Sequence, residues 1–362
     1  MPGFLIRRLD QLRKRPLFWG IWVACLIGIT IFLTLVGMPI PYALVIFALA
    51  IVSILFSRAK YLPILIIILL AIMPWTSQDQ YWLRVLITVG IYIMLALGLN
   101  VIIGFTGMLD LGYIAFFGIG AYTTALLTTH FHLSWWLCLL ASIVVAAIFG
   151  VLRGLPTLRL SGDYLAIVTL GFGEIARMTF ANWVGLTGGP MGIRDITPPS
   201  VFGFSFGFSA QWGYRLYYYL ILVLLGLTVL TITNLRNSRL GRAWVAIRED
   251  ETAAQTMGVN LSWNKTLAYA VGAAYGGAAG AFFASFNMFV SPNSFTFFES
   301  AIVLCMVVIG GIGSIPGVII GASILAAFPE VLRFMSEYRY LIFGLIMVIM
   351  VIFKPRGILP ER

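Results

Sequence analysis

The sequence predicts an all-α integral membrane protein, a polytopic bundle of about ten transmembrane helices. Hydrophobic residues make up 61% of the chain and charged residues 10%, against roughly 25% charged residues in soluble domains. Several apolar runs approach the ~20 residues that a helix needs to cross a bilayer. The net charge of +10 is spread over the ends of these runs, so it does not indicate nucleic-acid binding.

Apolar runs separated by charged or Gly/Pro-rich segments define the expected spans. They are 17–37, 41–57, 61–75, 82–104, 109–128 (interrupted by glycine), 134–152, 163–182, 214–235, 264–286, 296–312, 316–334 and 339–353. The segment 163–182 is expected to cross the membrane fully or in part, which leaves about ten to twelve helices. Within it, Glu174 and Arg177 share a helix face and can pair.

Basic residues set the expected orientation through the positive-inside rule. Arg7 to Arg15 precede the first apolar run, which is too long for a signal peptide and is interpreted as a retained span with a cytoplasmic start. Lys354 and Arg356 place the C-terminus inside as well. The Gly/Pro-rich segment 183–213 is then expected outside, and the charged segment 236–265 inside.

The charged segment between two spans, RNSRLGRAWVAIREDETAAQTMGVNLSWNK, is called the island below and covers Arg236–Lys265. Its pattern predicts a helix that ends at Gly258, because glycine is common just after helix C-termini. A polar helix kept between spans is expected to contact a soluble partner. A plain solvated loop is the alternative.

Two glycine series at a spacing of four residues predict close helix packing. They are Gly272, Gly276 and Gly280, and Gly313, Gly317 and Gly321. Sliding of these seams during transport is the alternative. The segments Gly104–Tyr122 and Gly310–Ile324 both run from a glycine-rich break into a helix of small residues, which indicates either an internal duplication or a coincidence.

Motifs of ATP-binding and hydrolytic enzymes do not occur in the sequence: it has no GxxxxGK[ST] P-loop, no HExxH and no GxSxG. We therefore expect no catalytic residues and no enzyme activity. Cys25, Cys138 and Cys305 lie in separate apolar runs, and His130 and His132 lie near a span end. These residues predict neither a disulfide nor a metal site.

Sequence blocks then occur in an order that resembles one family: LNVIIGFTGMLDLGYIAFFGIGAYTTALL, LRLSGDYLAIVTLGFGEIARM, TGGPMGI, LGRAWVAIREDETAAQTMG, SPNSFTFFESAIVL, VVIGGIGS and KPRGILP. Residues 80–356 resemble LivM-type permeases of high-affinity branched-chain amino acid ABC importers, with a fold like that of type II importers. Residues 1–75 resemble the accessory N-terminal helices of some members. A urea or amide ABC permease of the same fold and an ion-coupled secondary amino-acid carrier are the alternatives.

The resemblance implies a multi-pass permease subunit of the bacterial inner membrane, with both termini cytoplasmic, that transports leucine, isoleucine or valine. The implied partners are a homologous permease subunit, two cytoplasmic ATPase subunits that bind ATP and Mg, and a soluble substrate-binding protein. The chain itself would bind no cofactor and no metal.

The resemblance also implies that residues 236–262 are a coupling loop that docks into a groove of an ATPase. The family pattern E-A-A-x-x-x-G matches Thr252, Ala253, Ala254 and Gly258, with Glu251 one position early. The expected coupling residues are Arg239, Gly241, Arg242, Ala243, Arg248, Glu249, Glu251, Ala253, Ala254 and Gly258.

Ionisable residues within apolar runs are costly in lipid and are expected to face protein or water. They are Asp110, Asp163, Glu174, Arg177, Glu299 and Glu330. For the substrate path we expect helix N-termini at glycine breaks, which attract a carboxylate, and an aromatic wall for an apolar side chain. The candidate residues are Gly104, Gly107, Phe116, Phe117, Phe172, Gly188, Gly189, Glu299, Gly310, Gly311 and Gly313. Packing contacts are the alternative role for each of them.

Overall fold

The computed structural model describes residues 74, 80–158, 160, 162–201, 204–207, 212–331, 344–345, 348 and 357–359. Contacts divide the chain into two units, Met1–Leu86 and Ile87–Arg362. The spans expected at 17–37, 41–57 and 61–75 lie outside the described residues, apart from residue 74, and so does most of 339–353.

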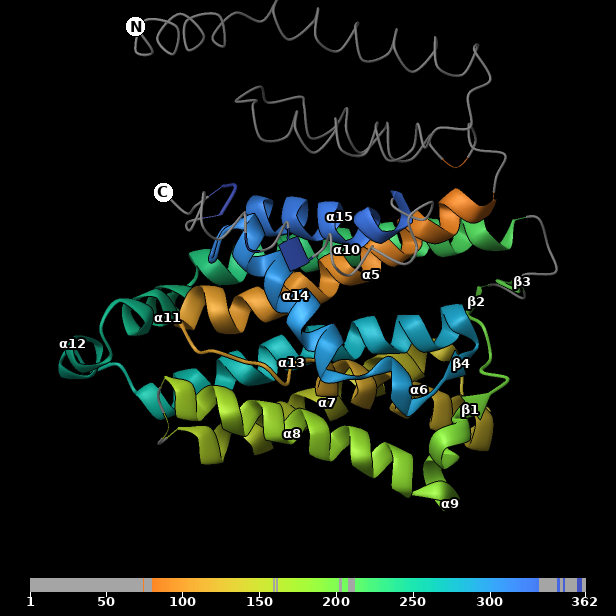
Figure 1. The fold of residues 1–362 in the computed structure, drawn as a ribbon, viewed down its shortest axis with the longest axis horizontal. Helices are drawn as coiled ribbons and strands as arrows, with labels where there is room; N and C mark the ends of the chain where they lie inside the picture. The colour runs from red at the N-terminus through yellow and green to blue at the C-terminus, as the bar shows by residue number, and fades with distance from the viewer. Residues whose placement is uncertain are drawn as a thin grey trace, which may run out of the picture. The chain divides into compact units, whose positions relative to one another are not determined.

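Seven of the described helical segments are long and apolar enough to cross a membrane (Figure 1). They are α5 (Gln80–Asn100) continued by the π-helix η1 (Val101–Phe105), α6 (Ile114–Phe131), α7 (Trp135–Thr157), α8 (Asp163–Asn182), α10 (Gly213–Asn237), α13 (Leu261–Asn287), and α14 (Phe297–Gly310) with the short η3 (Pro292–Ser294) before it. α15 (Ile315–Val331) is shorter. Each expected span between 82 and 331 therefore corresponds to a helix, and 163–182 forms one continuous helix of 20 residues.

The helix expected at 109–128 begins later, at Ile114, and its glycines do not interrupt it. Gly120 lies inside α6 because α13 approaches there: a Cβ on Gly120 would overlap the backbone of Gly277. The break comes earlier, in the segment 107–113, which is not helical. In this segment Asp110 accepts a hydrogen bond from the backbone N–H of Gly112 at 3.0 Å, a local turn that competes with helix formation.

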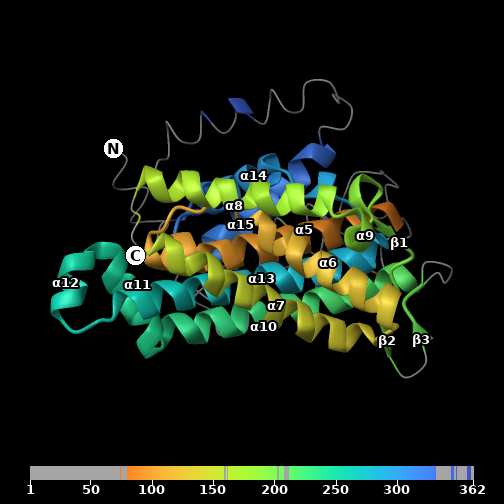
Figure 2. The same cartoon turned by 90° about the horizontal axis from the view of Figure 1, so that it is seen from below.

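α13 packs against both α6 and α7 in the middle of the bundle (Figures 1 and 2). The close packing predicted for its glycine series is confirmed, since a Cβ on Gly280 would overlap the carbonyl oxygen of Phe117. In the second series, a Cβ on Gly317 would overlap the carbonyl oxygen of Gly310, so α14 and α15 also approach closely. Gly313 differs, because it lies in the turn before α15 with φ of +84°.

The Gly/Pro-rich segment is more ordered than a loop. It holds α9 (Val184–Thr187), η2 (Gly189–Met191), β1 (Ile193–Arg194), and a hairpin of β2 (Ser200–Val201) and β3 (Phe204–Ser205). β1 pairs antiparallel with β4 (Phe289–Val290), just after α13. These elements lie at one end of the bundle, and the island helices α11 (Arg239–Glu249) and α12 (Glu251–Thr256) lie at the other (Figures 1 and 2).

Candidate functional site

A cavity of about 220 Å³ lies between α5, α6, α13 and α14. Its apolar wall consists of Ile91, Leu95, Ile114, Phe117, Phe283 and Phe286. Its polar lining consists of Thr88, Tyr92, Asn287, Ser294 and Glu299. The volume lies below the roughly 300–1,000 Å³ of drug-sized sites and well above the space for one water molecule. The cavity therefore suits a small, largely apolar molecule with a few polar groups.

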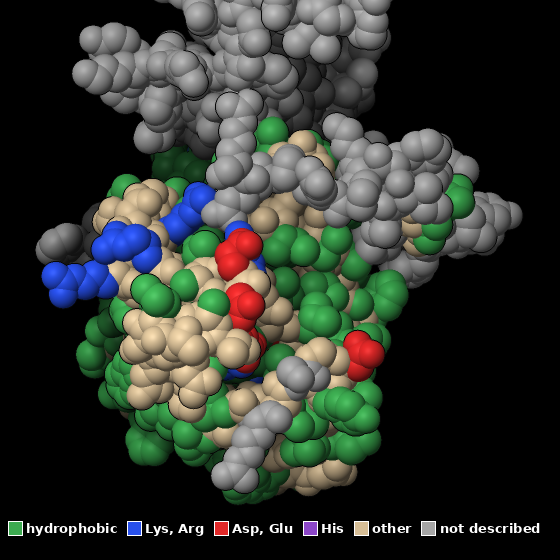
Figure 3. Space-filling view, turned by 90° about the vertical axis from the view of Figure 1, so that its left-hand side faces the viewer, with side chains coloured by type: hydrophobic (Ala, Val, Ile, Leu, Met, Phe, Trp, Pro, Cys, Tyr) green, Lys and Arg blue, Asp and Glu red, His purple; other side chains and the backbone are tan. Residues whose placement is uncertain are grey.

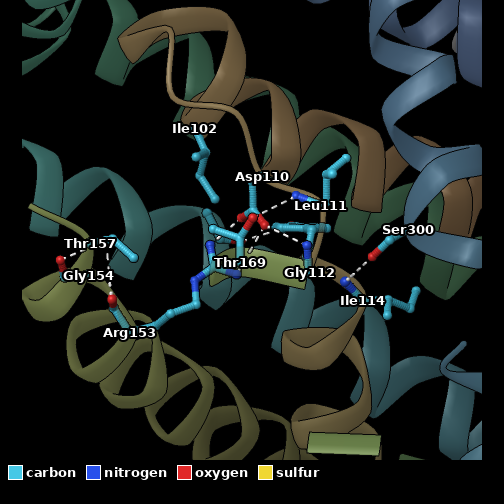
Figure 4. A network of polar contacts seen from close by, with 12 residues as sticks. Ile102, Asp110, Leu111, Gly112, Ile114, Arg153, Gly154, Thr157, Thr169 and Ser300 are labelled. Atoms are coloured by element: carbon cyan, nitrogen blue, oxygen red, sulfur yellow. Dashed lines mark hydrogen bonds and ion pairs between the residues drawn. The ribbon is translucent and has the colours of Figure 1, made fainter. Parts of the chain in front are cut away.

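Glu299 lies in the first turn of α14, at the wall of this cavity. The hydroxyl of Tyr92 on α5 donates a hydrogen bond to its Oε2 at 2.8 Å. The next residue, Ser300, accepts a hydrogen bond of 3.0 Å from the backbone N–H of Ile114, the first residue of α6 (Figure 4). The first turns of α6 and α14 thus meet beside the cavity, and both helix dipoles present their positive ends there.

The three phenylalanines expected in the substrate wall separate into two places. Phe117 lines the cavity and contacts Phe283 with a ring-centroid distance of 5.0 Å. Phe116 and Phe172 instead contact each other at 5.8 Å. The guanidinium of Arg153 lies over the ring of Phe116 at 4.4 Å and over that of Phe172 at 5.5 Å. The second pair therefore surrounds a buried cation.

This cation pairs with Asp110 in the non-helical segment before α6 (Figure 4). Arg153 lies on α7 and is 3% exposed, and Asp110 is completely buried. Both guanidinium N–H groups donate to the two carboxylate oxygens, one of them at 3.1 Å from Oδ1. The ring of Tyr269 on α13 covers the guanidinium at 4.6 Å. The pair is bidentate and enclosed by aromatic rings, which compensates part of the cost of burying two charges.

Further hydrogen bonds hold the segment 107–113 in place around this pair. Thr169 on α8 accepts one of 3.0 Å from the backbone N–H of Leu111. Together with the contact between Ile114 and Ser300, the segment is bonded to α7, α8 and α14. Among the described residues, no group of three His, Cys, Asp or Glu side chains is placed to hold a metal ion. The arrangement therefore positions backbone at the start of α6.

The island forms two helices instead of one. α11 is amphipathic: Gly241, Trp244 and Ile247 are buried. The indole Nε1 of Trp244 donates to the backbone oxygen of Asn264 at 2.9 Å, which joins α11 to α13. The opposite face of α11 is exposed and consists of Arg239, Arg242, Ala246 and Glu249. Charged side chains of both signs gather at this end of the bundle (Figure 3).

α12 begins at Asp250, which caps it by accepting hydrogen bonds from the backbone N–H groups of Thr252 and Ala253. Glu251 then pairs with Lys265 on α13, with 2.7 Å between Oε1 and Nζ. Ala254 is buried, whereas Ala253 on the neighbouring face is exposed. Glu251 and Ala254 therefore attach α12 to its own chain, while Ala253 remains on the outer face. Of the expected coupling residues on α11, Arg239, Arg242 and Glu249 are exposed, Ala243 and Arg248 are half-buried, and Gly241 is buried.

The predicted end of the island helix at Gly258 is confirmed. Gly258 has φ of +86°, the left-handed conformation that favours glycine. The backbone N–H of Val259 donates to the carbonyl of Ala254 at 3.0 Å, which closes the helix end. A Cβ on Gly258 would meet nothing within 4 Å, so the glycine satisfies the backbone conformation and not a steric limit within the chain.

Most of the glycines expected in the substrate path lie at the island end. The guanidinium of Arg248 donates to the carbonyl oxygen of Gly104 at 2.6 Å. The Cγ atom of Arg248 would lie 3.1 Å from a Cβ on Gly107. The backbone N–H of Gly313 donates to Oδ1 of Asn100 at 2.9 Å. Gly310 and Gly311 end α14 just before this turn. The two glycine-rich breaks of the sequence therefore lie against each other.

Gly188 and Gly189 join α9 to η2 at the opposite end, both with positive φ. Of the expected substrate-path residues, Phe117 and Glu299 line the cavity, and the glycines do not. The reason is the direction of the helices. Gly104 and Gly310 lie where η1 and α14 end, so the free backbone groups there are carbonyls and not the N–H groups that a carboxylate needs. The helix N-termini at the cavity begin at Ile114 and Phe297.

Sequence analysis did not identify several residues on which these sites depend: Tyr92, Asn100, Arg153, Trp244, Lys265, Asn287 and Ser294. Arg153 lies just beyond the expected span 134–152, but the apolar helix α7 continues past it to Thr157. A basic residue inside an apolar helix is a usable signal, since it requires a buried counterion. The predicted pair of Glu174 and Arg177 is confirmed at 2.8 Å.

Comparisons with known proteins agree with one another. The family model of the branched-chain amino acid transport system permease component matches residues 81–351. The chain is 46% identical over 288 residues to the high-affinity branched-chain amino acid transport system permease protein LivM of Salmonella typhimurium, covering 75% of this chain and 68% of the relative, and equally to LivM of Escherichia coli. It is 28% identical over 304 residues to the permease protein LivH of Salmonella typhimurium, covering 78% and 97%. No solved structure gives a significant match.

Proposed function

Because the chain belongs to the family of permease components of branched-chain amino acid transport systems, we propose that it carries leucine, isoleucine or valine across the bacterial inner membrane in an ATP-driven importer. The substrates are those named for its relatives. The apolar wall of the cavity, with Phe117 and Phe283, supports an aliphatic ligand more than urea, which is polar throughout. The chain is the membrane subunit, and ATP and Mg belong to partner subunits.

The observation that carries this proposal is the way the island is attached. Trp244, Arg248 and Glu251 fasten its inner face to α13 and η1, whereas a plain solvated loop would need no such contacts. The outer face remains exposed, and Met257 at its tip is 84% exposed. Because the island is fixed to the bundle on its inner face and exposed on its outer face, a movement of a docked ATPase can be transmitted through it to the spans.

A second permease subunit is the partner that fits α8. This helix is apolar and largely exposed, yet the ion pair of Glu174 and Arg177 on it leaves 31% and 28% of the two side chains exposed. Ionisable groups in a membrane avoid lipid tails and face protein or water. A homologous permease covering this face of α8 would shield the ion pair from lipid. Relatives of two kinds, LivM and LivH, carry permease names.

The orientation follows from the two ends of the bundle. The island, with its basic α11, is cytoplasmic, and the elements from α9 to β3 are external, where a soluble binding protein would deliver the substrate. Both termini are then cytoplasmic. An ion-coupled carrier would have no use for an ATPase dock, so the island separates the two functions.

Docking is tested by adding bulk to the outer face of α12. Ala253→Trp places a large ring on an exposed position without entering the core, and Val144→Trp on the exposed face of α7 is the matched control. We expect the wild-type chain and Val144→Trp to co-purify with the ATPase subunits of the same cell, and Ala253→Trp to lose them at normal membrane abundance. Co-purification and uptake that are unchanged in Ala253→Trp would contradict docking at this surface.

A further inference from the structure

The cavity between α5, α6, α13 and α14 contains one ionisable carboxylate in its lining, that of Glu299. We propose that Glu299 binds the α-ammonium group of the transported amino acid, with its side chain against the phenylalanines of the cavity wall. This inference rests on the proposed function and extends it, because it assigns the charged group of the substrate to one residue of this chain.

The first argument is that Glu299 lacks the internal counterion that Asp110 and Glu174 have. Asp110 pairs with Arg153, and Glu174 pairs with Arg177. Among the described residues, no Lys or Arg forms an ion pair with Glu299. A carboxylate in the membrane region requires a compensating charge or strong hydrogen bonds. A ligand that brings its own ammonium group supplies the compensation only while it is bound.

The second argument is the geometry around the carboxylate. The Tyr92 hydroxyl donates to Oε2 at 2.8 Å and so fixes the orientation of the group. An ionised carboxylate accepts through about four lone-pair positions, which leaves acceptor capacity for an ammonium group. Both residues line the cavity, so the ligand reaches the pair from the cavity side.

The third argument is that the remaining lining matches the rest of an aliphatic amino acid. Phe117, Phe283 and Phe286 provide apolar surface for a branched side chain. Asn287 and Ser294 add an amide and a hydroxyl that can donate to a carboxylate. The positive dipole end of α6 lies beside the same cavity at Ile114 and favours an anionic group there, while that of α14 favours the ionised form of Glu299 itself. Each of the three parts of the substrate therefore meets a complementary part of the wall.

The test measures ligand binding to the assembled importer in detergent by saturation-transfer NMR, which detects millimolar affinities. Three probes separate the charges: L-leucine carries both, L-leucinamide keeps the ammonium group without the carboxylate, and 4-methylpentanoate lacks the ammonium group. We compare the wild-type chain with Glu299→Gln, Glu299→Asp and Tyr92→Phe. Asp195→Asn is the control, because it removes an exposed carboxylate outside the cavity, and asparagine tolerates the left-handed conformation of residue 195.

We expect Glu299→Gln to weaken binding of leucine and leucinamide about 10- to 100-fold, the range for losing a hydrogen bond to a charged group. Its binding of 4-methylpentanoate should not weaken, Glu299→Asp should recover part of the loss, and Asp195→Asn should bind all probes like the wild type. Thermal unfolding of each variant shows that the fold is intact.

Glu299→Gln that binds leucine as the wild type does, or wild type that binds 4-methylpentanoate as tightly as leucine, would overturn the inference. ATP-driven uptake of leucine separates this failure from failure of the proposed function. If wild type and Glu299→Gln take up leucine equally, Glu299 is not the ammonium-binding residue and the proposed transport function is unaffected. If the wild-type importer takes up no branched-chain amino acid, the proposed function falls first.

Discussion

Arg248 of the island donates a hydrogen bond of 2.6 Å to the carbonyl oxygen of Gly104, 144 residues earlier in the chain. Gly104 lies in the π-helix η1, which directly precedes the segment 107–113 and the start of α6 at the cavity. π-Helical turns are rare in proteins as a whole, and those that occur are often at functional sites. A displacement of α11 by an ATPase would therefore reach the cavity through one short, hydrogen-bonded connection.

Arg248→Met tests this connection. Methionine keeps an unbranched apolar stem but cannot donate to Gly104, and a lost hydrogen bond from a charged group corresponds to about tenfold or more. We expect leucine uptake to fall about tenfold while the ATPase subunits still co-purify. Arg242→Met on the exposed face should show the opposite pattern: co-purification of the ATPase subunits should be lost before leucine uptake is reduced by any defect within the chain. Normal uptake by Arg248→Met would show that this contact is not needed for coupling.

Gly258 provides a second test of the island, because strain and bulk can be separated there. Asparagine tolerates the left-handed conformation, so Gly258→Asn should retain most uptake. Gly258→Trp adds strain and a large ring at a position where a Cβ meets nothing within 4 Å, and it should abolish uptake and ATPase co-purification at normal abundance. Both variants are assayed together with membrane abundance. If Gly258→Trp transports normally, the end of α12 does not contact a partner.

The pair of Asp110 and Arg153 should govern stability. Removing one member leaves a buried charge uncompensated, at a cost of about 3–5 kcal/mol. We expect Asp110→Asn and Arg153→Met each to lower the unfolding temperature in detergent strongly, and the double variant of Asp110→Asn and Arg153→Met to lower it by less than the sum. Glu174→Gln, which breaks a half-exposed pair, should cause a smaller change. Additive effects at 110 and 153 would mean that the two residues act independently.

Orientation is tested by single-cysteine labelling in intact cells after Cys25, Cys138 and Cys305 have been replaced. Met191→Cys in η2, where Met191 is 80% exposed, should react with a membrane-impermeant reagent from outside. Thr252→Cys in α12 should react only after the cells are permeabilised. Labelling of Thr252→Cys from outside would reverse the proposed orientation.

Much of the helical architecture could be predicted, because a span in lipid must satisfy its backbone internally and expose apolar side chains. The runs 163–182 and 214–235 correspond closely to α8 and α10 for this reason. The cap at Asp250 was also readable, since aspartate is a preferred N-cap residue, but the island was interpreted as one helix. The bend between α11 and α12 is what turns Glu251 towards Lys265.

The sites depend on contacts between residues far apart in sequence, and a period of apolar residues carries no information about these. Glu299 was identified as an ionisable residue within a span, but its neighbour Tyr92 lies 207 residues away. The glycine breaks were readable as breaks, while the direction of the helices on either side of them was not. The start of α6 depends on Asp110, whose position is held by Arg153 on another helix.

ATP-driven uptake of L-leucine into proteoliposomes tests whether the chain is the membrane subunit of an ATP-driven importer, with the chain reconstituted alone or together with a partner permease, ATPase subunits and binding protein. We expect the isolated chain neither to hydrolyse ATP nor to take up leucine, even when a proton or sodium gradient is imposed. The complete assembly should take up leucine, isoleucine and valine only when ATP is present. Gradient-driven uptake by the isolated chain, or uptake of urea but not of leucine by the complete assembly, would contradict the proposed function.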